Sequence, residues 1–284
     1  DGLIGPIDET LPQEARRAAV QRGPDVALAR GRLGAVRADV DIARAWENPT
    51  LGVSTATQTA RLGTSLSVPL PVFGQRVTAA KAAQANAEAA VLDVSVAAKE
   101  ARWNATMAWV DLWEAEQRAR LFGLAASDAD RLLGAAKEKY DAGSTSRVDV
   151  VRTGADPETA QAESESARRD ALAASARLAP FIGLAPSDSL QACGAPGYPE
   201  TALDRAGLHE TVAQHPVLRR DRAEIAARAA DVQNEQRKRW PIVTADVALN
   251  QFDPTLPAPD FMLGLSFQVP LFNQHGGEIA RARA

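Results

Sequence analysis

Apolar residues recur at alternating intervals of three and four along one long stretch, from Gly74 to about Tyr140, which contains no proline. A repeat held over this length is typical of a helix in a left-handed supercoil. Unbroken, this helix would be on the order of 100 Å long. Most repeat positions are alanine, which lets a neighbouring helix approach closely. The positions are Val77, Ala80, Gln84, Ala87, Val91, Val94, Ala98, Ala101, Ala105, Ala108, Leu112, Ala115, Ala119 and Phe122.

A second apolar stripe lies on a different face of the same predicted helix. It comprises Leu92, Val96, Trp103, Val110 and Trp113. Two apolar faces favour neighbours on both sides, as in a sheet or tube of helices. A long two-helix coiled coil with one wide seam explains the same pattern, and the stretch by itself leaves both interpretations open.

Proline and alternation signals predict the elements on either side of this helix. Residues 62–70 alternate apolar with small or polar residues, as a strand does, and the residues before them suit a tight hairpin turn. At Asp156–Pro157 we expect a kink or a restarted helix with Asp156 as its cap. We predict an irregular arm at 1–10, followed by the first structural repeat at 11–199. This repeat consists of a helix at 11–46 interrupted at Gly23–Pro24, a β-hairpin at 50–70, a long helix at 74–141, a return helix at 146–182 and a linker at 183–199. The seam of the return helix is Ala160, Ser164, Ala167, Ala171, Ala174, Leu178 and Phe181.

The pattern then begins again with the same order of elements. Pro24 aligns with Pro216, and Pro49 aligns with Pro241. We therefore predict a truncated second repeat over 200–284. It consists of a helix at 203–239, a β-hairpin at 242–269 and the start of a second long helix at 277–284. Most of the second helical hairpin would then be missing, so we expect the chain to be incomplete after Ala284.

Composition and charge narrow the class of protein. The 32 basic and 36 acidic residues give a net charge of −4, and no basic block indicates nucleic-acid binding. Aromatic residues make up only 5%, which favours close-packed helices over a compact core. Cys193 is the only cysteine, which excludes an intrachain disulfide and a cysteine-based metal cluster. The chain begins at Asp1 without a signal region, so we expect a removed signal peptide or a trimmed sequence.

The sequence contains no catalytic constellation. His209, Glu210 and His215 lack the spacing of a zinc-binding His-Glu-x-x-His helix, and we expect His215 and His275 to lie at the surface. No glycine-rich phosphate loop or nucleophile elbow is present. We therefore predict that the protein is not an enzyme and has no metal site and no cofactor.

The two predicted β-hairpins set the fold class. A single hairpin is not stable in water, and four strands are too few for a membrane-spanning barrel, which needs at least eight. Closure therefore requires several chains, of which three would supply about twelve strands. The strand faces are mixed rather than strongly apolar, so small water-exposed ribbons on a helical protein are the alternative. The predicted class is mainly α with a small β part: long antiparallel helical hairpins, two β-hairpins contributing four strands to a trimeric barrel, and an internal tandem repeat.

Four stretches carry a resemblance to a known family. They are ARAWENPTL before the first hairpin, PLPVFGQR after it, YDAGSTSRVDV between the long helices, and PLFNQHGGEIARARA after the second hairpin. In this order they resemble the TolC-type outer membrane efflux factor family. The endings FGQR and FNQHGGEIARARA are most similar to the branch that serves heavy-metal efflux of the cobalt–zinc–cadmium and copper type.

The resemblance implies a homotrimer in the outer membrane of a Gram-negative bacterium, with a β-barrel in contact with outer-membrane lipid and a helical tube in the periplasm. The duct would passively export substrates, heavy-metal cations in this branch. A periplasmic adaptor would connect it to an inner-membrane resistance-nodulation-division pump. A periplasmic adaptor and a soluble coiled-coil structural protein are the alternatives. The first would need a lipoyl-like β domain, and the second would not need hairpins at matching repeat positions.

By the same resemblance, the turn between the long helices is the tip to which the adaptor binds. Gly143 would make the turn, and Asp149 would lie near the helix N-terminus, where negative charge is favoured. The second tip turn is absent from the sequence. A plain helical hairpin without a partner explains the same residues. The predicted tip comprises Ala142, Gly143, Arg147 and Asp149, with Ser144, Thr145 and Ser146 capping the next helix and offering hydroxyls.

Overall fold

The computed structural model describes residues 9–10, 12–55, 62–197, 207, 211–251, 258–270, 272 and 274–284. The chain divides into two compact units. The helical unit comprises Asp1–Arg30 and Val94–Leu208, and the sheet unit comprises Gly31–Asp93 and His209–Ala284. Several predicted segments lie outside the described residues: the hairpin turn at 58–61, most of the arm at 1–10, and most of 198–210 with His209 and Glu210.

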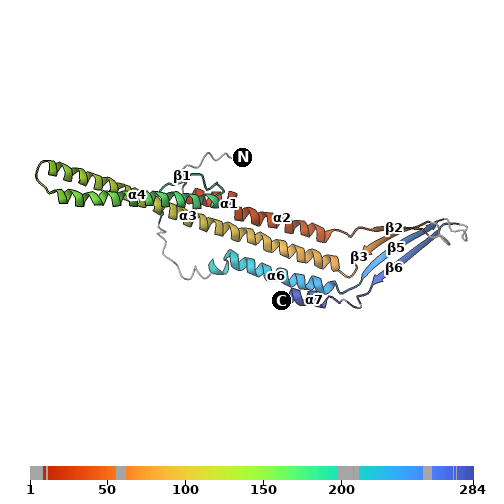
Figure 1. The fold of residues 1–284 in the computed structure, drawn as a ribbon. Coiled ribbons are helices and arrows are strands. Elements are labelled where there is room, and N and C mark those ends of the chain that lie inside the picture. The colour runs from red at the N-terminus through yellow and green to blue at the C-terminus, as the bar shows by residue number, and fades with distance from the viewer. Residues whose placement is uncertain are drawn as a thin grey trace. The chain divides into compact units, whose positions relative to one another are not determined.

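Helices dominate the chain and one four-stranded sheet supplies most of its β structure, so the predicted class, mainly α with a small β part, is confirmed for the single chain (Figure 1). The longest helix runs without a break over 67 residues, as the apolar repeat predicted. The helices are α1 (Pro12–Arg22), α2 (Pro24–Arg44), α3 (Gln75–Asp141), α4 (Arg147–Phe181), α6 (Pro216–Arg237) and α7 (Gly276–Arg283).

Prolines set two of the helix starts. The pattern at 11–46 is divided between α1 and α2, because Pro24 has no N–H to continue the preceding helix and is well suited to begin a new one. The helix predicted at 203–239 is divided in the same way, because residues 211–213 are helical and α6 begins at Pro216 after a break at 214–215. These two prolines are the pair that aligned in the sequence.

The seam of small residues forms the core of the helical unit. Ala101, Ala105, Ala108 and Leu112 of α3 are buried, but Val77 is 58% exposed, so only part of the predicted seam is filled. The seam predicted for α4 faces α3, since a Cβ at Gly123 would lie 3.8 Å from the Ser164 hydroxyl. Its buried members are Ser164, Ala167, Ala174 and Leu178.

Pro157 does not restart a helix. The α4 helix is continuous through it, so the predicted restart with Asp156 as cap is wrong. Pro157 lies three residues before Ala160 and is buried, which places its ring in the seam of α4. Burial of the ring partly offsets the missing N–H, which costs about 3 kcal/mol in an exposed helix.

The predicted irregular arm and linker meet in a short parallel bridge. Strand β1 (Glu9–Thr10) pairs with β4 (Gln191–Ala192), which the sequence did not indicate. The Ala192 N–H donates to both carboxylate oxygens of Glu116, at 3.1 and 3.2 Å, and the Leu190 N–H donates to the Ser175 hydroxyl at 2.8 Å. Burial raises the pKa of Glu116, and the Ala192 bond opposes that rise. The linker is therefore fastened to the helical hairpin at two points.

The sheet unit contains four antiparallel strands in the order β2-β3-β5-β6 (Figure 1). The two predicted hairpins lie side by side, because β3 pairs with β5 from Leu62↔Gln251 to Leu70↔Val243. The edges of the sheet are β2 and β6. The strands are β2 (Thr50–Ser54), β3 (Leu62–Leu70), β5 (Ile242–Gln251) and β6 (Asp260–Gln268).

The register gathers the apolar residues on one face, so the prediction of mixed strand faces is wrong. Directly paired residues share a face, and Leu66 pairs with both Leu51 and Val247, which in turn pairs with Leu263. The opposite face is mostly small and polar apart from Ile242 and Met262, and Asp246 there accepts from the hydroxyls of Ser67 and Ser266. The apolar residues of this face are Leu51, Val53, Leu62, Leu66, Val68, Leu70, Val243, Ala245, Val247, Leu249, Phe261, Leu263, Leu265 and Phe267, and the register adds Thr64 and Gln251 to it.

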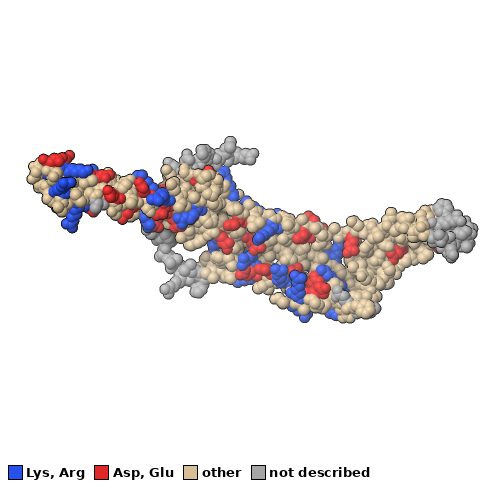
Figure 2. Space-filling view, viewed as in Figure 1, with Lys and Arg blue, Asp and Glu red and all other residues tan. Residues whose placement is uncertain are grey.

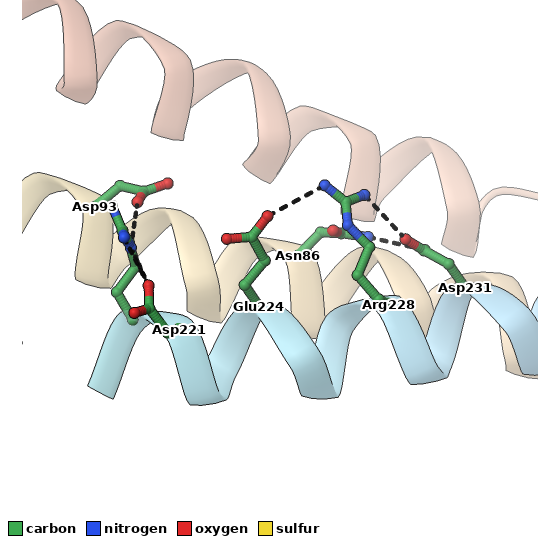
Figure 3. A network of polar contacts seen from close by, with 7 residues as sticks. Asn86, Asp93, Asp221, Glu224, Arg228 and Asp231 are labelled. Carbon is green, nitrogen blue, oxygen red and sulfur yellow. Dashed lines mark hydrogen bonds and ion pairs between the residues drawn. The ribbon is translucent and has the colours of Figure 1, made fainter. Parts of the chain in front are cut away.

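Polar side chains set the register of α3 against α6 within the sheet unit (Figure 3). Asn86 donates to Asp231 at 3.0 Å, and Arg220 lies 4.0 Å from Asp93. Arg228 pairs along α6 with both Asp231 and Glu224.

None of the described helices combines the length and hydrophobicity needed to cross a bilayer.

Candidate functional site

The turn between α3 and α4 is a Schellman motif at its α3 side. Gly143 is left-handed, with a φ of +73°, which a residue without a Cβ adopts without strain. The Ser144 N–H donates to the Lys139 carbonyl at 2.8 Å, and the Gly143 N–H donates to the Tyr140 carbonyl at 2.9 Å. These two bonds satisfy carbonyls that the helix end would leave unpaired. Gly143 therefore makes the turn, as predicted.

The α4 side of the turn is a capping box centred on Asp149. The Asp149 N–H donates to the Ser146 hydroxyl at 3.2 Å, and the Ser146 N–H donates back to Asp149 Oδ2 at 3.3 Å. The Ser146 and Thr145 hydroxyls donate to the same oxygen, at 2.7 and 3.2 Å. The bonds from Ser146 foremost, then from Thr145, lower the pKa of Asp149. Asp149 is thus the centre of the turn.

The three hydroxyls do not have the roles that the resemblance implied. Only Ser146 caps α4. The Ser144 hydroxyl donates to the Lys139 carbonyl at 3.1 Å and so closes α3 instead. Each hydroxyl proton is used inside the turn, so toward a partner these hydroxyls have only acceptor oxygens to offer. The turn is an internally bonded cap.

The surface of the turn includes two residues that the motif did not single out. Val148 and Val151, in the first turns of α4, are 75% and 69% exposed. Their spacing of three residues puts them on neighbouring positions of one helix face. This spacing was visible in the sequence as an apolar pair outside the α4 seam. Of the predicted tip residues, Ala142, Gly143, Ser144, Ser146, Arg147 and Asp149 are exposed and Thr145 is partly buried.

Among the candidate metal ligands, His215 has a structural role, since it caps α6 with its Nδ1 accepting from the Val217 N–H at 3.4 Å. His275 has a φ of 55°. Both histidines are only partly exposed, so the expectation of a surface position is only partly met. Across the described residues, no group of three or more His, Cys, Asp or Glu side chains could hold a metal ion.

A comparison with family models matches residues 15–184 to the outer membrane efflux protein model, which is more than half of the 284 residues. This chain belongs to the outer membrane efflux protein family. A comparison with curated proteins gives no match. Efflux family membership agrees with the predicted absence of an enzymatic activity.

Solved structures share the fold of this family member at low sequence identity. The crystal structure of CusC matches with a TM-score of 0.74 at 14% identity, over 100% of this chain and 71% of that one. The CmeC outer membrane channel of Campylobacter jejuni matches with a TM-score of 0.73 at 14% identity, over 95% of this chain and 63% of that one. The outer membrane protein VceC of Vibrio cholerae matches with a TM-score of 0.69 at 16% identity, over 96% and 72%.

Proposed function

We propose that this chain is the outer-membrane channel component of a tripartite efflux system. The observation that carries the proposal is the sheet, whose apolar face is uncovered on both edge strands, with Leu51 68% and Leu263 74% exposed. In water such a face on an open sheet invites aggregation, whereas in a bilayer it is favourable. Strands β3, β5 and β6 are 9 or 10 residues long, close to the 9–11 needed to cross a bilayer at a tilt.

The edges of the sheet support a homotrimer. Within the described chain, β2 and β6 each pair on one side only. Backbone N–H and C=O groups left unpaired in lipid cost several kcal/mol each. A ring in which β6 of one copy pairs with β2 of the next satisfies both edges, and three copies give about twelve strands. The outer surface of this closed sheet would contact outer-membrane lipid.

The tip turn is the proposed site for the periplasmic adaptor. It combines a preorganised backbone with two exposed valines, Val148 and Val151, so docking would bury apolar surface with little loss of backbone entropy. An adaptor would connect the duct to an inner-membrane resistance-nodulation-division pump, which supplies the energy. The duct itself is passive.

Heavy-metal cations are the proposed cargo. The support is the likeness of the endings FGQR and FNQHGGEIARARA to the heavy-metal branch. The lack of a metal-ligating group among the described residues is compatible with a duct, because a conduit that bound its cargo tightly would release it slowly.

Two measurements test the proposal. The gene product in its native host should be extracted from the outer membrane by detergent and have the mass of three chains. A strain without the gene should be more sensitive to cobalt, zinc, cadmium or copper salts. Normal tolerance of these cations with sensitivity to organic compounds would overturn the cargo alone. A water-soluble monomer would overturn the channel.

The tip is tested by site-specific photo-crosslinking. A crosslinker at Val148 should capture the adaptor, and one at Leu172, which is 64% exposed elsewhere on α4, should not. Equal capture from both positions, or capture from neither, would contradict docking at the tip.

A further inference from the structure

Aromatic side chains gather where the sheet joins its helices. The rings of Phe73 and Trp240 stack with centroids 5.4 Å apart and an angle of 26° between planes. The Arg76 guanidinium lies 4.5 Å from the centre of the Trp46 ring. Both tryptophans remain half exposed or more, Trp46 at 60% and Trp240 at 50%. We call this the junction.

The first turn of α3 holds both tryptophans at the same end of the sheet. Gln75 donates from Nε2 to the carbonyls of Trp240 and Pro241, at 3.2 and 3.3 Å. Arg76 donates to the Arg44 carbonyl, at 2.8 Å from Nε. Gln75 and Arg76 therefore connect the end of α2 to the start of β5, although α2 and β5 lie far apart in sequence.

The apolar face of the sheet ends at this junction. Its last cross-strand set is Leu70, Val243 and Phe267, and Val269 continues it at 60% exposure. On the face in view in Figure 2, charged atoms are sparse over the sheet and frequent over the helices. Tryptophan is enriched where hydrocarbon meets water. The junction thus lies where the head groups of a bilayer would be.

The junction carries an excess of positive charge. Arg237, Lys238 and Arg239 are consecutive, exposed, and immediately precede Trp240. Lys238 pairs with Glu235 at 2.6 Å, but no carboxylate of the described residues forms an ion pair with Arg237 or Arg239. The two arginines are therefore available to an external anion.

A hollow of about 320 Å³ opens beside Lys238, the residue between the two arginines in the chain, and neither arginine is among its lining residues. Lys238 and His275 line its polar part, and Ile242, Val269, Pro270 and Phe272 line its apolar part. Such a lining suits a molecule with a charged head and an apolar body. Guanidinium groups bind phosphate oxygens with paired hydrogen bonds, which ammonium groups do not reproduce.

We propose that the junction binds an anionic phospholipid of the inner leaflet of the outer membrane, with Arg237 and Arg239 on its phosphate and the hollow against the start of its acyl chains. This inference rests on the proposed membrane position. To that position it adds the class of lipid that is bound and the residues that select this lipid. Each basic side chain near an anionic surface strengthens attraction, so removal of two should weaken retention of the lipid about 30-fold.

The test uses the detergent-extracted protein reconstituted in nanodiscs of phosphatidylethanolamine with or without phosphatidylglycerol. Native mass spectrometry should find phosphatidylglycerol retained by the wild type and lost from the double variant Arg237→Gln, Arg239→Gln. The matched control, Arg168→Gln with Arg169→Gln, changes two exposed arginines of α4 and should retain the lipid. The charge-preserving variant Arg237→Lys, Arg239→Lys should regain part of the retention.

The outcomes separate this inference from the proposed function. Equal retention of both lipids by the wild type, or unchanged retention by the glutamine variant, would overturn the lipid site while trimer mass and cation tolerance stay intact. A protein that never enters the membrane would overturn both. Loss of the lipid from the α4 control as well would show a general charge effect and contradict a site at the junction.

Discussion

The helical hairpin and the sheet treat their apolar residues in opposite ways. The α3–α4 hairpin buries its seam within one chain, where Leu178 is 0% exposed. The sheet places its larger side chains on one open face, where Leu265 is 65% exposed. A helix satisfies its backbone alone and needs only a second helix to cover its seam. A sheet with two open edges needs further strands to pair with them, and its exposed apolar face needs an apolar medium. The sheet therefore depends on partners outside the chain, whereas the helical hairpin does not.

The largest expected effect is in the hairpin. Leu178→Ala should lower the free energy of unfolding by about 2–5 kcal/mol, because it leaves a cavity in a buried seam. Chemical denaturation followed by circular dichroism measures it. Leu172→Ala on the same helix is the control, and its 64% exposure predicts a much smaller change. Equal losses would mean that the seam is not the core.

The next effect is in the sheet. Leu265→Arg on β6 should cost about 2–4 kcal/mol if the apolar face contacts the bilayer midplane, and less near an interface. Gln268→Arg, on the opposite face of the same strand, should be tolerated. The amount of folded protein in the outer membrane reports both. A reversed order of the two variants would contradict the assignment of the lipid-facing side.

Much of the hairpin could be predicted from sequence because its signals are local. The repeat of small residues set the length of α3, and Gly143 fixed the turn. The seam of α4 is also visible in the sequence. The helix break predicted at Pro157 is wrong because the local cost of proline can be read from sequence, whereas the burial of its ring against other residues cannot. The alternation of residues 62–70 is visible in the sequence, but the continuous apolar face is not, because Leu51, Leu66, Val247 and Leu263 come together only through strand pairing.

The candidate site was predictable in part for the same reason. The tip residues were named from a short motif, but the roles of Ser144, Thr145 and Ser146 depend on which carbonyl or carboxylate each hydroxyl reaches. A sequence pattern does not show toward which acceptor each hydroxyl points. The bridge between Glu9–Thr10 and Gln191–Ala192 is shorter than any strand signal, which is why the arm and linker were expected to be irregular.

A smaller effect is expected at the tip. Ser146→Ala removes the cap of α4 and should cost about 0.5–2 kcal/mol of local stability. Hydrogen exchange of the peptide 145–155 should be faster, while the seam near Leu178 stays protected. Faster exchange along all of α4 would mean that the turn and seam are one cooperative element, contrary to a locally closed cap.

The smallest effect concerns pH. Because the folded-state pKa of Asp149 is lowered, its carboxylate contributes stability above the unfolded pKa, and this contribution is lost as the pH falls through the folded value. The difference in unfolding free energy between wild type and Asp149→Asn should therefore shrink from about pH 6 to about pH 3. Asp170→Asn is the control, since Asp170 is exposed and has no hydrogen-bond partner among the described side chains. A constant difference would contradict the bonds at Oδ2.

The central claim is that the sheet is completed by other copies of the chain. It is tested most directly by disulfide crosslinking in the native membrane after Cys193→Ser. One cysteine replaces Val53 on β2, and a second is scanned over Leu263, Leu265 and Phe267 on β6, since a disulfide forms only where Cα atoms come within about 4.4–6.8 Å. We predict intermolecular bands that stop at three chains, with one β6 position dominant. Crosslinks absent at every position, or a ladder that continues beyond three, would contradict the account.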